Sequence, residues 1–327
     1  MTAPERHHVT VVGEALIDLV PSGGPLTFKA KEGGSPLNVA VGLARLGVRT
    51  SLMARLGDNV FGRVLRRYLE SESVDLSASP TASEPTTLAV VSLDEAGNAM
   101  YDFYTDGTAD WQWSLEELDL VPTDTTIVHF GSIASWTDPG WLHIVELVEK
   151  LHGRGDVLVS YDPNVRPMLC GGRDQATSRV ERAVSSSHLV KVSAEDLAWL
   201  YPDKSPGAVA QGWTELGAGL VVVTSGAAGA SAYHRDGIAA TRPAATVSVV
   251  DTVGAGDSFS AALIAALCDA GFASPGKVAL IESKALDVAL RYAVIASSIT
   301  CSRSGANPPT STEVQNALGA ENENMSI

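Results

Sequence analysis

Short apolar runs alternate along the chain with longer segments of helical periodicity. The runs are rich in Val, Ile and Leu and are almost uninterrupted by polar residues, which is typical of strands buried on both faces. Such strands in alternation with helices predict an α/β fold with a doubly wound, mostly parallel sheet. The expected strands cover residues 8–13, 126–131, 156–162, 188–193, 219–226 and 245–251.

Two segments depart from this pattern, residues 19–32 and residues 86–107. The second has the alternation of two strands joined by "DEAGN", which predicts a hairpin that stands off the main sheet. We expect both segments to form a small β lid on a single domain spanning residues 1–327, and the lid to close over a ligand and exclude water. The polar tail, residues 319–327, is expected to be disordered from about Gly319.

Composition and charge narrow the function. The 327 residues are 45% hydrophobic, enough to bury a large core, and the net charge of −15 argues against binding to nucleic acid or to an anionic membrane. No apolar run approaches the length of a bilayer span, so we expect a soluble protein, and the lack of paired cysteines makes a cytoplasmic location the simplest expectation. The three scattered cysteines indicate neither a disulfide framework nor a zinc site, and the seven histidines lack metal-ligand spacing.

The stretch "TVGAGDSFSAAL", residues 252–263, opens a predicted helix whose apolar stripe includes Phe259 and Leu263. Gly254, Ala255 and Gly256 would leave backbone N–H groups free at the positive end of the helix dipole, which makes an anion site suited to phosphate. Asp257 falls in the first turn opposite the stripe, where an ionised carboxylate could take a proton from a substrate hydroxyl. The alternative is an ordinary strand-to-helix turn in which the aspartate only complements the dipole.

Two other stretches match known nucleotide-binding motifs only in part. "GAGDSF" has no third glycine of the dinucleotide fingerprint, and "GFASPGKV", residues 271–278, has Val278 where a phosphate loop needs Ser or Thr. We therefore expect residues 271–278 to be a loop between helices.

A second glycine cluster, "EGGSPLNVAVGLARLG", covers residues 32–47. It predicts a helix with Ser35 as N-cap and Pro36 as its first residue. Asn38 falls off the apolar face of that helix.

Together, the segment from Gly33 to Gly47 and Gly57 and the stretch "DTVGAGDSFSAA" resemble the two signatures of the PfkB, or ribokinase-like, carbohydrate kinases. Two long patterns in the same order are more specific than either alone. The resemblance covers most of the chain and is strongest to bacterial fructokinases. The other similar stretches are "GEALID" (13–18), "LGDNVFG" (56–62), "FYTDGTAD" (103–110), "DPNVRP" (162–167), "VTSG" (223–226) and "SRSGANPP" (302–309).

The resemblance implies a ribokinase-like fold and a role for each matching residue. Asp257 would be the catalytic base that takes the proton of the sugar hydroxyl as it attacks the γ-phosphate of ATP, with Gly254, Ala255 and Gly256 as the anion hole. The alternatives for Asp18 and Asn38 are a turn residue and a surface amide. The implied sugar-binding residues are Asp18, Gly33, Gly34, Asn38 and Asn164, and the implied nucleotide-binding residues are Ser193, Thr224, Gly226 and Gly229.

Arg166 follows a predicted strand end, where α/β sheets bind ligands, and its planar fork suits a pair of phosphate oxygens. The resemblance places it at the transferring phosphate or the substrate, and a surface ion pair is the alternative.

Mg²⁺ is expected with ATP. Where ribokinases have an NxxE motif that organises Mg²⁺ through water, this chain has "SAED", so either Glu195 or Asp196 would serve. The resemblance also leaves open a monovalent cation such as K⁺ near Asp251 and Gly305, where several relatives bind one.

The implied activity is ATP-dependent phosphorylation of a primary sugar hydroxyl, with D-fructose converted to fructose 6-phosphate. Thr105 and Asp106 stand where many fructokinases have arginine, which leaves 2-keto-3-deoxygluconate kinase, ribokinase and nucleoside kinase as alternatives, and a non-catalytic sugar-binding regulator as another. We expect Trp111 and Trp113 to pack under the lid rather than to stack on a sugar. Exposed strand edges in the lid predict a homodimer.

Overall fold

Eight strands form the central sheet of the computed structural model, which describes residues 7–24, 26–93, 99–235 and 237–324. The strands from β12 to β4 run parallel, and a β13–β14 hairpin adds two antiparallel strands at one edge. The expected α/β class is therefore confirmed. In spatial order the strands are β14 (Gly237–Arg242), β13 (Ala230–His234), β12 (Leu220–Thr224), β11 (Leu189–Ser193), β10 (Leu158–Asp162), β9 (Ile127–Gly131), β1 (His8–Val12) and β4 (Arg49–Met53).

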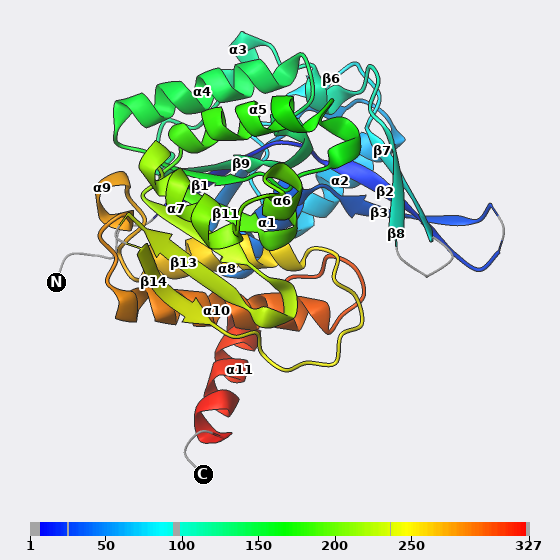
Figure 1. Cartoon of the computed structure of the whole chain (residues 1–327). Helices are drawn as coiled ribbons and strands as arrows, with labels where there is room; N and C mark the ends of the chain where they lie inside the picture. The colour runs from blue at the N-terminus through cyan, green and yellow to red at the C-terminus, as the bar shows by residue number, and fades with distance from the viewer. Residues whose placement is uncertain (1–6, 25, 94–98, 236, 325–327) are drawn as a thin grey trace.

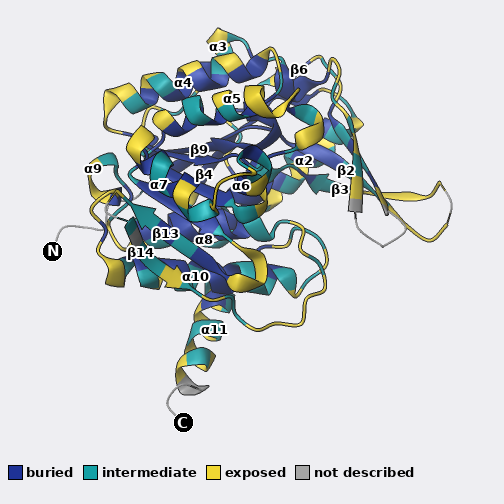
Figure 2. Ribbon diagram, viewed as in Figure 1, coloured by how far each residue is buried: buried dark blue, intermediate teal, exposed yellow. Residues whose placement is uncertain are grey.

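Successive residues of the parallel strands face two different cores, as Leu220 and Val221 of β12 do. Helices α1, α2, α8 and α10 contribute to one core, and α4, α5, α6 and α7 contribute to the other, so the sheet is buried on both faces (Figures 1 and 2). The helices are α1 (Ser35–Arg45), α2 (Val60–Ser71), α3 (Leu115–Leu118), α4 (Gly140–Arg154), α5 (Arg173–Ser185), α6 (Ala194–Leu200), α7 (Pro206–Leu216), α8 (Ala255–Asp269), α9 (Pro275–Val278), α10 (Ser283–Cys301) and α11 (Ser311–Asn324).

A second sheet of four strands projects from one end of the molecule (Figure 1). Its order is β3 (Phe28–Gly33), β2 (Leu16–Pro21), β7 (Leu88–Leu93) and β8 (Ala99–Tyr104), with β2 and β7 parallel and the other pairs antiparallel. The two predicted lid segments thus pair with each other, and the expected hairpin is confirmed. Its turn, residues 94–98, lies outside the described residues. A small pair, β5 (Leu56–Gly57) and β6 (Thr81–Ala82), lies apart from both sheets.

The expected strand at residues 245–251 is wrong. The β13–β14 hairpin takes the sheet edge, and the chain after it runs without regular structure toward α8. Val249 and Val250 are 62% and 63% exposed, so their alternation with polar residues does not mark a buried strand. The prediction failed because an extended loop beside a cavity has the same pattern of apolar residues as a strand.

The expected disorder from Gly319 is also wrong for the residues described, because α11 continues through Asn324. Arg291 of α10 pairs with Glu321 at 2.7 Å, and Val314 is fully buried, so the helix is held against α10. Residues 325–327 lie outside the described residues.

Two smaller predictions hold. Residues 271–278 connect α8 to α10 and include the short helix α9, and Trp111 and Trp113 are buried in the core that also holds α4. Within the described ranges, every helix is too short or too polar to cross a bilayer.

Candidate active site

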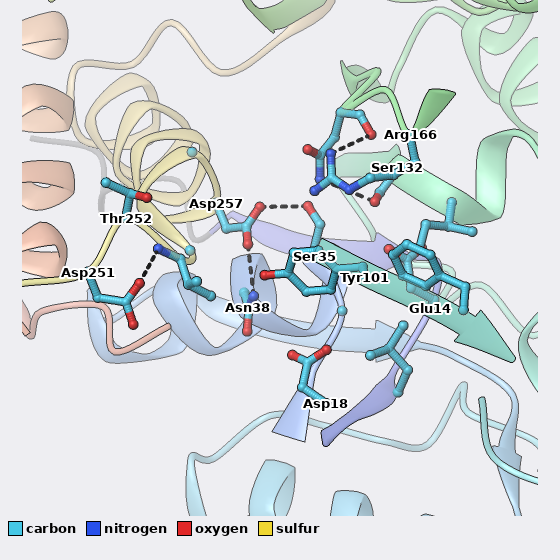
Figure 3. A pocket seen from close by; sticks show the side chains of 18 of the residues that line it. Glu14, Asp18, Ser35, Asn38, Tyr101, Ser132, Arg166, Asp251, Thr252 and Asp257 are labelled. Carbon is cyan, nitrogen blue, oxygen red and sulfur yellow. Dashed lines mark hydrogen bonds between the residues drawn. The ribbon is translucent and has the colours of Figure 1, made fainter. Parts of the chain in front are cut away.

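A cleft of about 830 Å³ lies where the lid sheet meets the N-terminal ends of α1 and α8 (Figure 3). Segments far apart in the sequence line it, from β2 in the lid to the turn before α8. The structure therefore brings together both glycine clusters singled out in the sequence. The predicted site residues that line the cleft are Asp18, Gly34, Asn38, Asn164, Arg166, Asp251, Gly254, Gly256 and Asp257.

Asp257 is the best-positioned carboxylate in the cleft. It lies in the first turn of α8 and is 8% exposed. Its Oδ1 accepts a hydrogen bond from Ser35 Oγ at 2.6 Å, and its Oδ2 accepts one from Asn38 Nδ2 at 2.8 Å (Figure 3). Burial raises the pKa of Asp257, while these two donors and the charge of Lys191 oppose that rise. The carboxylate is thus held in place at a site that is partly shielded from water.

The expected capping role of Ser35 is wrong. The N-cap of α1 is Gly34, and the Ser35 side chain makes no capping hydrogen bond. Its hydroxyl is directed instead at Asp257, on an element far away in the sequence. A serine before a proline looks the same in the sequence whether its hydroxyl caps the helix or bonds a distant residue. The sequence therefore could not identify Asp257 as the hydrogen-bond partner of Ser35.

The N-terminus of α8 requires glycine at position 254. Gly254 has φ 75°, and a Cβ there would lie 2.6 Å from the Cβ of Ala306. The N–H groups of Gly254, Gly256 and Asp257 have no hydrogen-bond partner among the described residues, whereas the N–H of Ala255 donates to Thr252 O at 3.2 Å. This first turn therefore presents three free N–H donors that could bind an anion, whereas the N–H of Ala255 is already engaged.

Asp18 lies at the lid side of the cleft. Burial raises its pKa to about 6, and the positive charges of Arg166 and Lys31 oppose the rise. A Cβ on Gly33 would lie 2.2 Å from Asp18 Oδ2, and a Cβ on Gly34 would lie 2.8 Å from the carbonyl oxygen of Glu14. The two glycines therefore let the start of α1 approach the lid strand closely.

Arg166 reaches the cleft from a loop with unusual backbone angles. Asn164 has φ 42° and donates to Ser132 Oγ at 3.2 Å, and Ser132 itself has φ 56°. Arg166 Nη1 donates to the carbonyl oxygens of Asn164 and Val165 at 3.3 and 3.0 Å. Arg166 makes no salt bridge with any residue that the structure describes, so the surface ion pair considered as the alternative does not form there.

Several cleft residues were missed by the sequence analysis. Glu14 is fully buried, its Oε2 accepts from Ala134 N at 3.1 Å, and its Oε1 has no partner among the described residues. Burial raises the pKa of Glu14 to about 7. Tyr101 enters from β8, and Lys191 from the middle of β11. For Lys191, the sequence offered one indication of a special role: a lysine stands inside the apolar run "HLVKVS", where a buried strand is expected.

The predicted nucleotide-binding residues do not line this cleft. They lie at the carboxyl ends of β11 and β12, where Ser193 and Thr224 are register partners. Ser193 caps α6 by accepting from Asp196 N at 2.9 Å. Gly226 and Gly229 follow with φ 50° and 94°.

Of the two carboxylates in "SAED", Glu195 is exposed, whereas Asp196 accepts from Val165 N at 3.1 Å. Burial raises the pKa of Asp196 to about 6.

Asp251 accepts from Val253 N at 3.0 Å and from Gly305 N at 2.8 Å. Across the described residues, no group of three or more His, Cys, Asp or Glu side chains is arranged to hold a metal ion. Thr105 and Asp106 lie outside the cleft, beyond the end of β8.

Comparison with known proteins agrees with this geometry. Residues 6–313 match the pfkB family carbohydrate kinase profile. The chain is 36% identical over 279 residues to a fructokinase of Rhizobium leguminosarum bv. trifolii, covering 84% of each. A fructokinase structure from Xylella fastidiosa with bound ATP superposes with a TM-score of 0.89 at 28% identity, covering 97% of this chain and 99% of the other. A double mutant of Vibrio cholerae O395 fructokinase, with fructose, ADP and potassium bound, gives 0.82 at 27% identity, covering 97% and 99%.

Proposed function

The chain belongs to the pfkB family of carbohydrate kinases, and on that premise we propose that it transfers the γ-phosphoryl group of ATP to the primary 6-hydroxyl of D-fructose. One observation carries the proposal. Asp257 is held by Ser35 and Asn38 in the first turn of α8, beside free N–H donors and across the cleft from Asp18. Similarity to named fructokinases over most of the chain supports fructose as the sugar.

The reaction needs positioning, a base and charge stabilisation. The sugar oxygen forms a bond to the γ-phosphorus, the bond from that phosphorus to the bridging oxygen breaks, and ADP leaves. Asp257 Oδ takes the hydroxyl proton. The N–H groups of Gly254 and Gly256 and the guanidinium of Arg166 stabilise the negative charge on the transferring oxygens, and Ala255 contributes through its place in the turn rather than through a free donor.

The sugar is bound at the lid side. Asp18 and the amides of Asn38 and Asn164 supply acceptors and donors for its hydroxyls, and the backbone of Gly33 and Gly34 allows the close approach. The lid sheet covers the cleft and limits hydrolysis of ATP by water.

The nucleotide is proposed to lie over the carboxyl ends of β11 and β12, in contact with Ser193, Thr224, Gly226 and Gly229. Magnesium would be held mainly by the ATP phosphates and through water by Asp196. The buried Asp162 Oδ1, which has no partner among the described residues, is a second acceptor suited to an ion-bound water. When bound, Mg²⁺ would neutralise negative charge on the ATP phosphates during the transfer. Exposed Glu195 fits this role less well. A potassium ion beside Asp251 is proposed on the likeness to the Vibrio cholerae structure.

We also propose a homodimer that forms through the lid. Strands β3 and β8 are the edges of the lid sheet, and Phe28, Met100 and Tyr104 are 41%, 55% and 61% exposed on them. Light scattering on the purified protein tests this, with a monomer mass as the contrary result. A cytoplasmic location is proposed from the use of ATP and from the three free cysteines.

Release of ADP from Mg·ATP tests the function, with fructose, 2-keto-3-deoxygluconate, ribose, tagatose and adenosine offered in parallel. Turnover with fructose well above the others is expected. Preference for another sugar would keep the kinase and change its substrate. Sugar binding by thermal shift without turnover would instead favour the non-catalytic regulator.

A further inference from the structure

Lys191 is a buried cation inside a strand of the central sheet. It lies in the middle of β11, is 6% exposed, and donates from Nζ to Asp162 Oδ2 at 2.6 Å. Asp162, at the end of β10, is 1% exposed and also accepts from Ser260 Oγ at 3.2 Å. An ammonium has three N–H donors, and only this one bond is made with the described residues. Lys191 therefore keeps unused hydrogen-bonding capacity in a buried position.

The ammonium lies at the anion site. Lys191 lines the cleft, and a Cβ built on Gly256 would lie 3.1 Å from its Nζ, so the charge sits against the first turn of α8. That turn also carries the free N–H groups of Gly256 and Asp257. Three independent donors thus converge beside the base.

Fold stability alone does not account for this pair. Taking a lysine and an aspartate out of water costs several kcal/mol per ion, and a well-packed apolar pair in the same place is commonly as stable. Binding of a negatively charged ligand by the Lys191 ammonium explains the buried pair better than packing does.

We propose that Lys191 is a catalytic residue of the kinase, donating a hydrogen bond from Nζ to a non-bridging oxygen of the phosphoryl group as it is transferred. This inference rests on the proposed function. Lys191 stays protonated throughout, because the hydroxyl proton goes to Asp257. Asp162 accepts one N–H of the ammonium and so directs the others toward the cleft. A purely structural role, in which Lys191 only neutralises Asp162, is the competing explanation.

The test compares nucleotides that differ in the γ-phosphate. Lys191→Met leaves Asp162 buried and unpaired, which threatens folding, so the variant Lys191→Met with Asp162→Asn removes both charges together. Binding of Mg·AMP-PNP and of Mg·ADP is measured by calorimetry after a thermal-melt check of folding. Loss of a charge-assisted hydrogen bond to the γ-phosphate predicts that binding of AMP-PNP weakens about 10- to 100-fold more than binding of ADP, since loss of the Asp162 carboxylate affects the Mg²⁺ site with both nucleotides alike. The matched control is Lys150→Met on the exposed face of α4, which should change neither affinity.

The outcomes separate the two hypotheses. If the double variant binds AMP-PNP as tightly as wild type and retains turnover, Lys191 is structural and the inference is wrong. Equal weakening of ADP and AMP-PNP would also overturn it. If the wild type phosphorylates no sugar, the proposed function fails, yet the contrast between the nucleotides still decides the role of Lys191. Should both variants fail to fold, a crystal structure of wild type with Mg·ADP, aluminium fluoride and fructose decides: Nζ within hydrogen-bond distance of a fluoride supports the inference, and contact with Asp162 alone refutes it.

Discussion

Replacement of Asp257 by asparagine separates its chemistry from its place in the fold. The amide has the shape of the carboxylate and fills the same site between Ser35 and Asn38. It has no useful basicity, so the sugar hydroxyl loses its proton acceptor. A positioned base contributes about 10²- to 10⁴-fold in rate, and we expect kcat to fall by that factor with a much smaller change in the affinity for fructose.

Stability is expected to move little, because two effects oppose each other. One of the two hydrogen bonds at position 257 is lost when the amide NH₂ meets a donor, which costs about 1 kcal/mol. Against this, the pKa of Asp257 is raised in the folded protein, so above that pKa the ionised carboxylate opposes folding and its neutral replacement removes the penalty. For a chain of 327 residues a net change of 1 kcal/mol shifts Tm by only about 1 to 2 °C.

The assay is coupled ADP release with saturating fructose, read beside a thermal melt and a fructose titration of the same preparation. A loss of turnover with an intact melt and intact sugar binding supports the base assignment. A decrease of only a few-fold in kcat would refute it, since a proton acceptor would then have to exist elsewhere in the cleft.

Three further predictions follow from the same geometry. Because the pKa of Asp18 is about 6, kcat/KM for fructose should fall as pH drops below about 6 and the carboxylate loses its acceptor capacity; a profile that stays flat to about pH 5 would contradict this role. Because burial raises the pKa of Glu14 from 4.5 to about 7, its ionisation opposes folding above about pH 7, so Glu14→Gln should raise Tm near pH 8 and leave it unchanged near pH 4.5, as thermal melts would show. Gly254→Ala should lower both Tm and kcat because its Cβ meets Ala306, whereas Gly271→Ala, with the same φ of 75° and open space around it, should cost only about 1 kcal/mol and leave kcat unchanged. Equal effects of the two glycine substitutions would argue against the tight turn.

Much of the core could be predicted because each strand there is buried on both faces. Runs such as residues 188–193 and 219–226 carry that constraint in their composition, and both contain strands of the sheet. The segment 245–251 satisfies the same pattern for another reason, since Val249 and Val250 line the cleft and do not belong to a core. Strands β13 and β14 were missed because each contains two alanines, which have weak strand propensity, and neither has a continuous run of large apolar residues.

The candidate site divides in a similar way. Asp257 and Gly254 are visible in the sequence because helix starts and glycine turns leave local signals, whereas the role of Asn38 came from the resemblance of its segment to a family signature. The contact between Ser35 and Asp257 joins residues 222 positions apart and depends on how α1 packs on α8, which no local pattern records. Lys191 and Glu14 could not be placed for the same reason: which face of a strand points at a cleft depends on the register of the whole sheet.

Identification of the product by ³¹P nuclear magnetic resonance tests the central claim most directly. With Mg·ATP and fructose, we predict a new phosphomonoester signal coupled to the protons on carbon 6, formed in equal amount to ADP and absent with the Asp257→Asn variant. Release of inorganic phosphate alone, a phosphate on another hydroxyl, or an unchanged spectrum of ATP would contradict the account.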